Sequence, residues 1–534
     1  MSGVATMADI GAIERRTDTE EVDVLIVGYG PVGAAIAGLL GRYGVRTLVV
    51  DKADDIFMAP RAIALDNEAL RILQMVGLPD RAFAKIEISH VKLHSPHLGE
   101  FARINTSGTI DGHPKLVTFY QPELERALRG HAESHATVTA RTGVEMVALD
   151  DDGDGVDVVL RGRDGVQSTV RAQYVVGADG ACSRARTAIG EDFDGETYAE
   201  DWLIVDALGV PGGFDHVEFL CNPDRPTPHM VAPGGRTRWE FMLRPGETRE
   251  EMEHDSTIAR LLEPWAKATD IRIERKAVYR FHARACKRFS KGRVFLAGDA
   301  AHVTPPFVGQ GLVAGLRDAA NLAWKLAWVV LGRASETILD SYDRERRPHA
   351  AKMIALAKVM GQMVMPRDHA RAVLVHGSIA LLRQLPPFRR LIDELEVKPA
   401  NAFADGLFVR ADDRVRRGTW MAQSLVRSSG RTSVLSDEVL GPELALVGFG
   451  ADPLRWLSER SRRHWSNAAG RIVHLEATSD LEGRLVGGAA PEGWCLVVRP
   501  DRTILHGGPV EAANRIVRES LRLLGSPAAR APER

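Results

Sequence analysis

Cysteine is scarce in this sequence and is never paired. The four cysteines stand far apart in a chain of 534 residues, and no two of them have a C-x-x-C spacing or another spacing typical of metal ligands. They are Cys182, Cys221, Cys286 and Cys495. The sequence therefore excludes a redox centre built from neighbouring cysteines, and it predicts no metal site. Reduced, mostly buried thiols are typical of a reducing compartment, so we expect a cytoplasmic protein.

Long apolar runs and a strong charge of either sign are also absent. The richest apolar stretch, residues 322–331, is short and is interrupted by Lys325, so the sequence predicts no membrane span. Residues 1–20 are polar and lack the apolar core of a signal peptide, and we expect them to form a flexible N-terminal segment. Because the formal net charge is −2, neither nucleic acid nor an anionic membrane is favoured as a partner.

A glycine-rich turn near the N-terminus has the sequence context of a dinucleotide-binding site. The segment Gly28-Tyr-Gly-Pro-Val-Gly33 follows an apolar strand at 24–27 and precedes a helical pattern at 34–40. Glycines here let the backbone approach a pyrophosphate, and the helix N-terminus supplies unpaired N–H groups. A second strand ends at Asp51, whose carboxylate can bind ribose hydroxyls and argues against a 2′-phosphate. The tightly held dinucleotide is therefore FAD or NAD, with the predicted contacts Gly28, Gly30, Pro31, Val32, Gly33, Asp51 and Lys52.

Two later segments point to a flavin. Gly177-Ala-Asp-Gly180 follows an apolar strand and, taken alone, is an ordinary turn. Gly298-Asp299 follows another strand, and its carboxylate can bind ribityl hydroxyls. The chain then passes Pro305-Pro306 and enters a helix at Gly309-Gln-Gly311. The start of that helix would face the flavin pyrimidine edge, where negative charge accumulates on reduction. Together, the three segments fit one flavin between them.

In this order, the three segments resemble those of the class A, single-component flavoprotein aromatic hydroxylases, over residues 21–360. Within that family the likeness is closest to the 3-(3-hydroxyphenyl)propanoate hydroxylases, and it is carried by segments 60–66, 239–247, 317–325 and 340–347. The resemblance implies tightly but non-covalently bound FAD, with Arg61 near the isoalloxazine ring and Gln121 beside the cofactor. It also places Asp179 where the family has a residue that contacts both FAD and NAD(P)H. Its further implied cofactor contacts are Gly298, Asp299, Pro306, Gly309, Gly311, Leu312 and Val313.

Val313 departs from the family pattern. The family usually carries asparagine at this position, and the asparagine side chain is expected to touch the pyrimidine edge of the flavin. Valine cannot make that polar contact, although its backbone N–H remains. We expect FAD binding to persist, with altered flavin movement or redox tuning.

The order of the predicted elements indicates an α/β protein. We expect a Rossmann-type FAD-binding domain at 21–398, interrupted by a mixed β-sheet substrate domain at about 88–120 and 195–285, with a helical region at 322–398. Residues 399–534 resemble the thioredoxin-like C-terminal domain of related hydroxylases. Strands are predicted there at 444–448, 471–475 and 494–498, and a helix at 454–459. Cys495 is the only cysteine in that region, so the redox dithiol of thioredoxin is absent. We therefore interpret the C-terminal region as structural or as a dimer contact, and we expect a homodimer.

The sequence contains a single dinucleotide-binding fingerprint, and this limits the reactions that the protein can catalyse. A second candidate, Gly448-Phe-Gly-Ala-Asp-Pro453, fails because proline replaces the third glycine, so NADH or NADPH must bind transiently. The resemblance implies hydroxylation of a phenolic acid such as 3-(3-hydroxyphenyl)propanoate to a catechol, with O₂, through a C4a-hydroperoxyflavin. Another phenol, or a heteroaromatic ring, is the chief alternative substrate. A flavin reductase or dehydrogenase that does not activate O₂, and a flavoprotein without enzymatic activity, are the alternative classes.

The residues that would handle the substrate are less well defined. His302 and His229 are candidates for acid–base chemistry on the phenol, although a histidine in the position of His302 equally suits backbone capping. Arg236 and Arg238 could hold a substrate carboxylate, or could simply be exposed. Strand alternation places Trp239 and Phe241 on the face opposite Arg238. These two aromatic residues could line the ring site or pack in the core.

Overall fold

The computed structural model describes most of the chain. The described residues are 19–59, 61–211, 215–267, 269–394, 398–410, 415–427 and 433–527. The N-terminal segment expected to be flexible lies outside this range, apart from its last two residues, and so does Pro60 of the segment 60–66.

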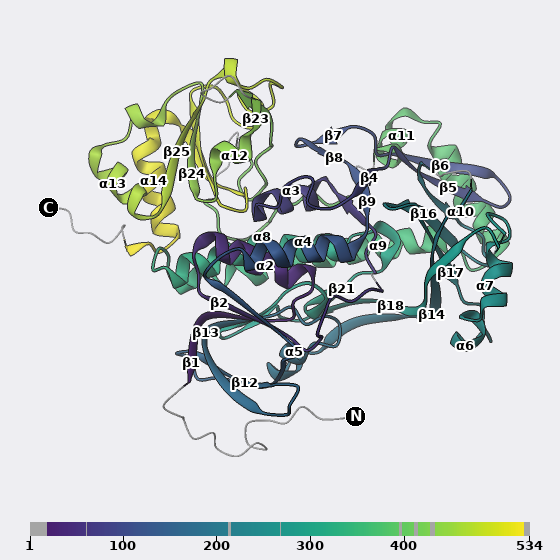
Figure 1. Ribbon diagram of the computed structural model, residues 1–534. Coiled ribbons are helices and arrows are strands. Elements are labelled where there is room, and N and C mark those ends of the chain that lie inside the picture. The colour runs from purple at the N-terminus through teal and green to yellow at the C-terminus, as the bar shows by residue number, and fades with distance from the viewer. Residues whose placement is uncertain are drawn as a thin grey trace.

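A largely parallel sheet forms the base of the molecule (Figure 1). Its main strands lie in the order β10-β2-β1-β13-β12-β11, and β20 pairs with β13. The strand bounds are Glu20–Val27 (β1), Thr47–Asp51 (β2), Val138–Thr142 (β10), Glu145–Asp151 (β11), Val156–Arg161 (β12), Gln167–Gly177 (β13) and Val294–Leu296 (β20). Residues 24–27 are buried because helices and the rest of the sheet cover both of their faces, which explains their unbroken apolar sequence.

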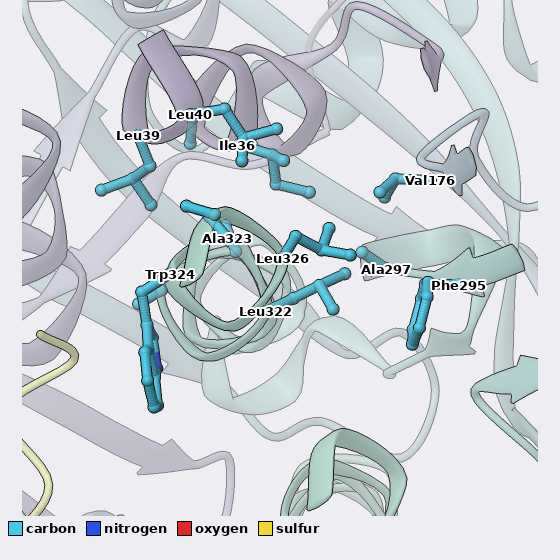
Figure 2. Close-up of a cluster of buried hydrophobic side chains, with 14 of the residues drawn as sticks. Ile36, Leu39, Leu40, Val176, Phe295, Ala297, Leu322, Ala323, Trp324 and Leu326 are labelled. Atoms are coloured by element: carbon cyan, nitrogen blue, oxygen red, sulfur yellow. The ribbon is translucent and has the colours of Figure 1, made fainter. Parts of the chain in front are cut away.

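Helices α2 (Pro31–Tyr43) and α8 (Gly311–Val330) pack against each other over this sheet. Pro31 occupies the first turn of α2, where its missing N–H costs nothing, and Gly44 ends the helix at φ 79°. Figure 2 shows Ala323 of α8 beside Ile36 of α2, while Leu326 lies toward Phe295 and Ala297 of the sheet side. Helices α3 (Asn67–Val76) and α4 (Gln121–Glu133) lie alongside. This core fixes where the glycine-rich turns meet.

A second large sheet lies to one side and carries two distinct faces (Figure 1). Its order is β21-β18-β14-β17-β16-β15-β5-β6. The bounds are His90–Ser95 (β5), Gly99–Asn105 (β6), Phe193–Leu208 (β14), Val217–Leu220 (β15), Thr227–Ala232 (β16), Arg236–Met242 (β17), Arg272–Cys286 (β18) and His302–Val303 (β21). One face packs against α7 (Asp255–Leu262) and the short helix α6 (Arg249–Met252). The other face turns toward residues 61–63 and 307.

Three further helices follow α8. They are α9 (Ser341–Val364), α10 (His369–Leu382) and α11 (Pro386–Asp393). Helix α9 contacts β18 and the 3-10 turn Pro306–Val308, while α10 and α11 contact β6. None of the helices in the described ranges is both long enough and apolar enough to cross a membrane.

The C-terminal region forms a separate α/β unit (Figure 1). Its sheet has the order β25-β24-β26-β27, with β24 parallel to β25 and antiparallel to β26, which is the arrangement of a thioredoxin fold. The elements are Leu444–Phe449 (β24), Glu459–Asn467 (α13), Gly470–Leu475 (β25), Trp494–Val498 (β26), Ile504–Pro509 (β27) and Ala513–Leu523 (α14). The α/β fold class is confirmed. The helix expected at 454–459 is wrong, because Ser458 caps the helix that begins at Glu459.

Candidate functional site

A cavity of about 220 Å³ opens at the carboxyl ends of β1, β2 and β13. Open α/β sheets bind ligands at this edge. The cavity wall brings together five residues that the sequence assigned to the dinucleotide, namely Gly28, Gly30, Asp51, Lys52 and Asp179. It also includes Glu145 and Met146 of β11, Cys182, and Arg184 at the start of the short helix α5 (Arg184–Ala188), none of which a motif marked.

The glycine-rich turn leaves room for an anion at the start of α2. Gly28 has φ 103°, and a Cβ there would collide with the carbonyl of Ala178. A Cβ on Gly33 would collide with the Gly28 carbonyl, whereas the space beside Gly30 is open. Helix α2 has no side-chain cap and no acidic residue in its first turn. Its free N–H groups and positive dipole end therefore suit a pyrophosphate.

Two carboxylates at this edge are held by backbone N–H groups. Asp51 Oδ2 accepts from the Tyr29 N–H at 2.7 Å and Oδ1 accepts from the Ala53 N–H at 2.8 Å, which fixes the carboxylate beside the glycine turn. Each oxygen still has a second lone pair for a ribose hydroxyl. Asp179 is more fully occupied, since it accepts from Ser183 Oγ at 2.5 Å and from the Arg184 N–H at 2.7 Å. Burial raises the pKa of Asp179, and these hydrogen bonds oppose that rise.

The third glycine segment lies against the first. A Cβ on Gly315 of α8 would approach Val32 Cγ2 to 2.5 Å and Gly298 Cα to 3.1 Å, so α2, α8 and the Gly298 turn meet in close contact. Asp299 follows, with its side chain 36% exposed, and forms an ion pair with Arg61 at 3.5 Å. Although the side chain is partly exposed, desolvation by the surrounding protein raises the pKa of Asp299, and Arg61 and then His302 oppose the rise. Gln121 Oε1 accepts from the Ala62 N–H at 3.0 Å and so ties the Arg61 segment to α4.

The start of α8 is a second uncapped helix N-terminus. Pro306 begins a 3-10 turn, and Gly309 closes it at φ 61° with a hydrogen bond from its N–H to the Pro306 carbonyl at 2.8 Å. Helix α8 then begins at Gly311 with no side-chain cap and no acidic residue in its first turn. The N–H groups of residues 311–313 have no acceptor within the helix. A partly anionic ring edge is the kind of group that such a terminus stabilises.

Comparison with known proteins agrees with this geometry. The FAD binding domain family matches residues 21–357, and the HcaD C-terminal domain family matches residues 418–523. A 3-(3-hydroxy-phenyl)propionate/3-hydroxycinnamic acid hydroxylase from Comamonas testosteroni is 31% identical, covering 96% of this chain and 99% of that protein. One from Mycobacterium avium is 36% identical over 88% and 83% of the two chains.

The chain belongs to the FAD-binding aromatic hydroxylases. The expected cofactor, FAD, is thereby confirmed, and NAD(P)H is typical of the class. Among solved structures, the flavin-dependent monooxygenase PieE has a TM-score of 0.79 at 23% identity, covering 94% of this chain and 99% of its own. An aklavinone-11 hydroxylase has a TM-score of 0.76 at 24% identity, with coverages of 94% and 99%. These two likenesses concern the fold.

Val313 contributes to the core of the hydroxylase. Its side chain is completely buried with the apolar residues of the first domain. Leu312, beside it, is partly buried against the same core. The backbone N–H of Val313, in the first turn of α8, has no acceptor within the helix.

An aromatic cluster covers the face of the second sheet that turns toward residues 61–63. It consists of Tyr198, Trp202, Phe281 and Phe307. The Trp202 and Phe281 ring centroids are 5.5 Å apart, and Phe307, from the turn after Pro306, lies 5.9 Å from both Trp202 and Tyr198. No sequence motif marked these residues, because their encounter depends on the pairing of β14 with β18 and on the turn that brings Phe307 to them.

Three expected substrate residues lie on the opposite face of this sheet. Trp239 and Phe241 are buried with the α7 side chains, and Trp265 packs against both rings. His229 also contacts the Trp265 ring and lies 3.2 Å from Glu218. Burial lowers the pKa of His229 to about 4, so the imidazole is neutral near pH 7. Trp239 and Phe241 therefore pack in the core, which is one of the two alternatives that the sequence left open, and His229 lies on the same face of the sheet, opposite the aromatic cluster.

His302 is a buried structural residue. Its Nε2 lies 2.7 Å from Asp318 Oδ2, and the ring stacks on Phe289. Asp318 also accepts from the Gly298 N–H at 3.0 Å and from Arg346 Nε at 2.8 Å. Burial alone would raise the pKa of Asp318, but His302 and Arg346 outweigh it and lower the pKa. The alternative anticipated for His302, a role in holding the turn, is the one this placement supports.

Both candidate arginines already have carboxylate partners. Arg236 bonds to Glu274 at 2.6 and 3.0 Å and lies over the Tyr120 ring. Arg238 bonds to Asp206 at 2.7 and 3.0 Å and donates to the Arg61 carbonyl at 3.0 Å. Arg238 is buried, so the alternative that it is simply exposed is wrong for this residue, and a role of either arginine in holding a substrate carboxylate stays a prediction. Through its hydrogen bond to the Arg61 carbonyl, Arg238 links the second sheet to the segment that contains Arg61.

Proposed function

We propose that this hydroxylase converts 3-(3-hydroxyphenyl)propanoate, or a close phenolic acid, to a catechol with NADH or NADPH and O₂. The observation that carries the proposal is the likeness to hydroxylases of that name along nearly the whole chain, the C-terminal unit included. The alternatives are a different phenol or heteroaromatic ring, and a reductase that does not activate O₂. The expected homodimer stays a prediction.

In this proposal the adenosine part of FAD lies in the 220 Å³ cavity, with its ribose at Asp51 and its pyrophosphate at the start of α2. The ribityl chain would meet Asp299, and the pyrimidine edge would meet residues 311–313. The flavin would supply the activation of O₂ and the transfer of one oxygen atom to an electron-rich ring.

The protein then positions the ring and excludes water. The aromatic cluster offers an apolar surface on the cofactor-facing side of the second sheet, and such a surface favours a phenyl ring. A dry site protects a reactive oxygen donor from breakdown by water. Among the cluster, Tyr198 carries the hydroxyl group, and burial raises its pKa, so it is a hydrogen-bond donor near neutral pH.

The test is a coupled assay on the purified FAD-loaded protein with NADH and NADPH in turn. We expect 3-(3-hydroxyphenyl)propanoate to raise NAD(P)H consumption about tenfold or more, with equal oxygen uptake and one catechol formed per oxygen consumed. The control is 3-phenylpropanoate, which has the same carboxylate but no activating hydroxyl and should give no catechol. If the phenol stimulates NAD(P)H use while all the oxygen appears as H₂O₂, or if no phenolic acid stimulates it, the proposal is wrong.

A further inference from the structure

A largely buried cluster of charged side chains lies next to the first turn of α8. It consists of Asp66 and Glu68, at the start of α3, together with Arg317 of α8 and Lys398. Lys398 comes from the segment that leads from the FAD-binding part of the chain into the C-terminal unit. Its Nζ lies 2.7 Å from Asp66 Oδ2 and 3.1 Å from Glu68 Oε1. Two carboxylates thus face two cations, and the cluster is neutral as a whole.

The cluster forms hydrogen bonds with the side chain of Gln310, the residue just before α8. Arg317 donates from Nη1 and Nη2 to Gln310 Oε1, both at 3.0 Å, and Gln310 Nε2 donates to Asp66 Oδ2 at 3.0 Å. Gln310 stands between Gly309 and Gly311, the two glycines of the proposed flavin contact. Its side chain is therefore used to fix this turn and not to cap α8, which leaves the N–H groups of the first turn free.

The carboxylates depend on both cations for their charge. Burial alone would raise the pKa of Asp66, but Lys398 and Arg317 outweigh it, and the pKa is well below its ordinary value. For Glu68, burial also acts to raise the pKa, and Arg317 and then Lys398 lower it. Arg317 is completely buried and cannot serve two carboxylates and Gln310 by itself without leaving one negative charge uncompensated.

We propose that Lys398 is a positioning residue of the flavin site, which keeps the cluster behind α8 neutral and thereby sets how strongly the helix terminus stabilises reduced flavin. The proposal rests on the placement of the pyrimidine edge at residues 311–313. A reduced flavin carries negative charge at that edge, and a net negative cluster behind the turn would oppose the positive end of the helix. The segment entering the C-terminal unit is thereby coupled electrostatically to the cofactor.

The test compares Lys398→Met and Glu68→Gln, which change the cluster charge in opposite directions. Lys398→Met leaves one excess negative charge, and we expect reduced flavin to bind about tenfold less tightly relative to oxidised flavin. That ratio corresponds to a two-electron potential about 30 mV more negative. Glu68→Gln leaves one excess positive charge and should shift the potential the opposite way by a similar amount. The readouts are the potential and the FAD dissociation constant of the apoprotein, neither of which requires turnover.

Charge and shape are separated by two further variants. The double variant Glu68→Gln with Lys398→Met restores neutrality and should return the potential toward the wild-type value. Lys398→Arg keeps the positive charge, so this single variant should have a potential close to that of the wild type. The matched control is Lys276→Met, which breaks an exposed 2.6 Å pair with Asp255 on the second sheet and should leave the potential unchanged.

An unchanged potential in both single variants overturns the proposal. So does a double variant whose potential departs further from wild type than that of Lys398→Met, because the effect would then be one of packing. The outcome is also distinguishable from failure of the proposed hydroxylation. A wild-type protein that binds FAD and shows these shifts, but hydroxylates no phenolic acid, retains this inference and loses the other.

Discussion

The Asp318 carboxylate joins three segments that come from distant parts of the chain. It accepts from the Gly298 backbone, from His302 and from Arg346, so the turn that carries Asp299 is tied to both α8 and α9. All of these groups are buried, and a buried carboxylate that loses a donor has no water to replace it. Asp318 therefore holds the His302 ring in position in the core.

At this scale we predict that His302 can be replaced without loss of chemistry. His302→Gln retains a donor toward Asp318, and His302→Ala does not. Both variants should keep the pH profile of kcat/KM for the phenol, while the alanine variant should lose about 1–3 kcal/mol of unfolding free energy, measured with urea. A catalytic base would show the reverse pattern. Disappearance of one limb of the pH profile in a stable His302→Gln protein would contradict the prediction.

Among the elements, the pairing of α2 with α8 brings the glycine segments together. Both helices are apolar on the sides that face each other and the sheet, as Figure 2 shows for Ile36 and Ala323. Gly315 lets α8 approach closely enough for Val32 and Gly298 to touch it. The two uncapped helix N-termini thus lie near each other, in positions suited to the pyrophosphate and the isoalloxazine ring of one FAD.

We predict that Gly315→Ala weakens both folding and FAD binding. The added methyl group would lie 2.5 Å from Val32, so the helices must separate, at a cost of about 1–3 kcal/mol. The control is Gly130→Ala in α4, where no atom lies within 4 Å of the new Cβ, and where we expect a neutral or slightly stabilising effect. Urea unfolding and titration of the apoprotein with FAD measure the two effects. Equal behaviour of the two variants would disprove the argument.

Over the whole molecule, a second buried network joins the C-terminal unit to the FAD-binding part. Arg499 donates to Glu345 of α9 at 2.7 and 2.9 Å and to Asp501 at 3.0 Å, and Lys325 of α8 donates to Glu345 at 2.8 Å. Arg499, Glu345 and Lys325 are completely buried. Burial alone would raise the pKa of Glu345, but Arg499 and Lys325 outweigh it and hold the pKa far below its ordinary value.

This network predicts a pH dependence of stability. Because the pKa of Glu345 is lower in the folded state, the unfolded state binds more protons as the pH falls below about 5, and folding free energy is lost in that range. Glu345→Gln should cost about 3–5 kcal/mol at pH 7 and should flatten the decline below about pH 5. Urea midpoints at several pH values measure this. The control is Glu196→Gln, which removes an exposed pair with Lys358 and should change stability by about 0.5 kcal/mol or less. An equally steep decline in Glu345→Gln would show that other groups cause it.

The local elements of the FAD-binding part could be predicted because their signals are local. Apolar runs, Pro31 at a helix start and glycines at positive φ specify strands, helices and turns within a few residues. The helix expected at 454–459 was misplaced because two start signals compete there: Pro453 begins a 3-10 turn, and Ser458 caps the true helix. The sequence also indicated one flavin from three segments, which the matching family bears out.

The sequence by itself determined the cofactor class and the α/β framework, since both depend on short-range patterns of glycine, acid and apolar residues. Only the tertiary structure decided on which face of the second sheet each side chain lies. His229, Trp239 and Phe241 turned out to lie behind the second sheet, and Phe307 joined Trp202 on its cofactor side. Strand alternation fixes which residues share a face, but the packing partner decides which face is the site, and that partner comes from distant parts of the chain.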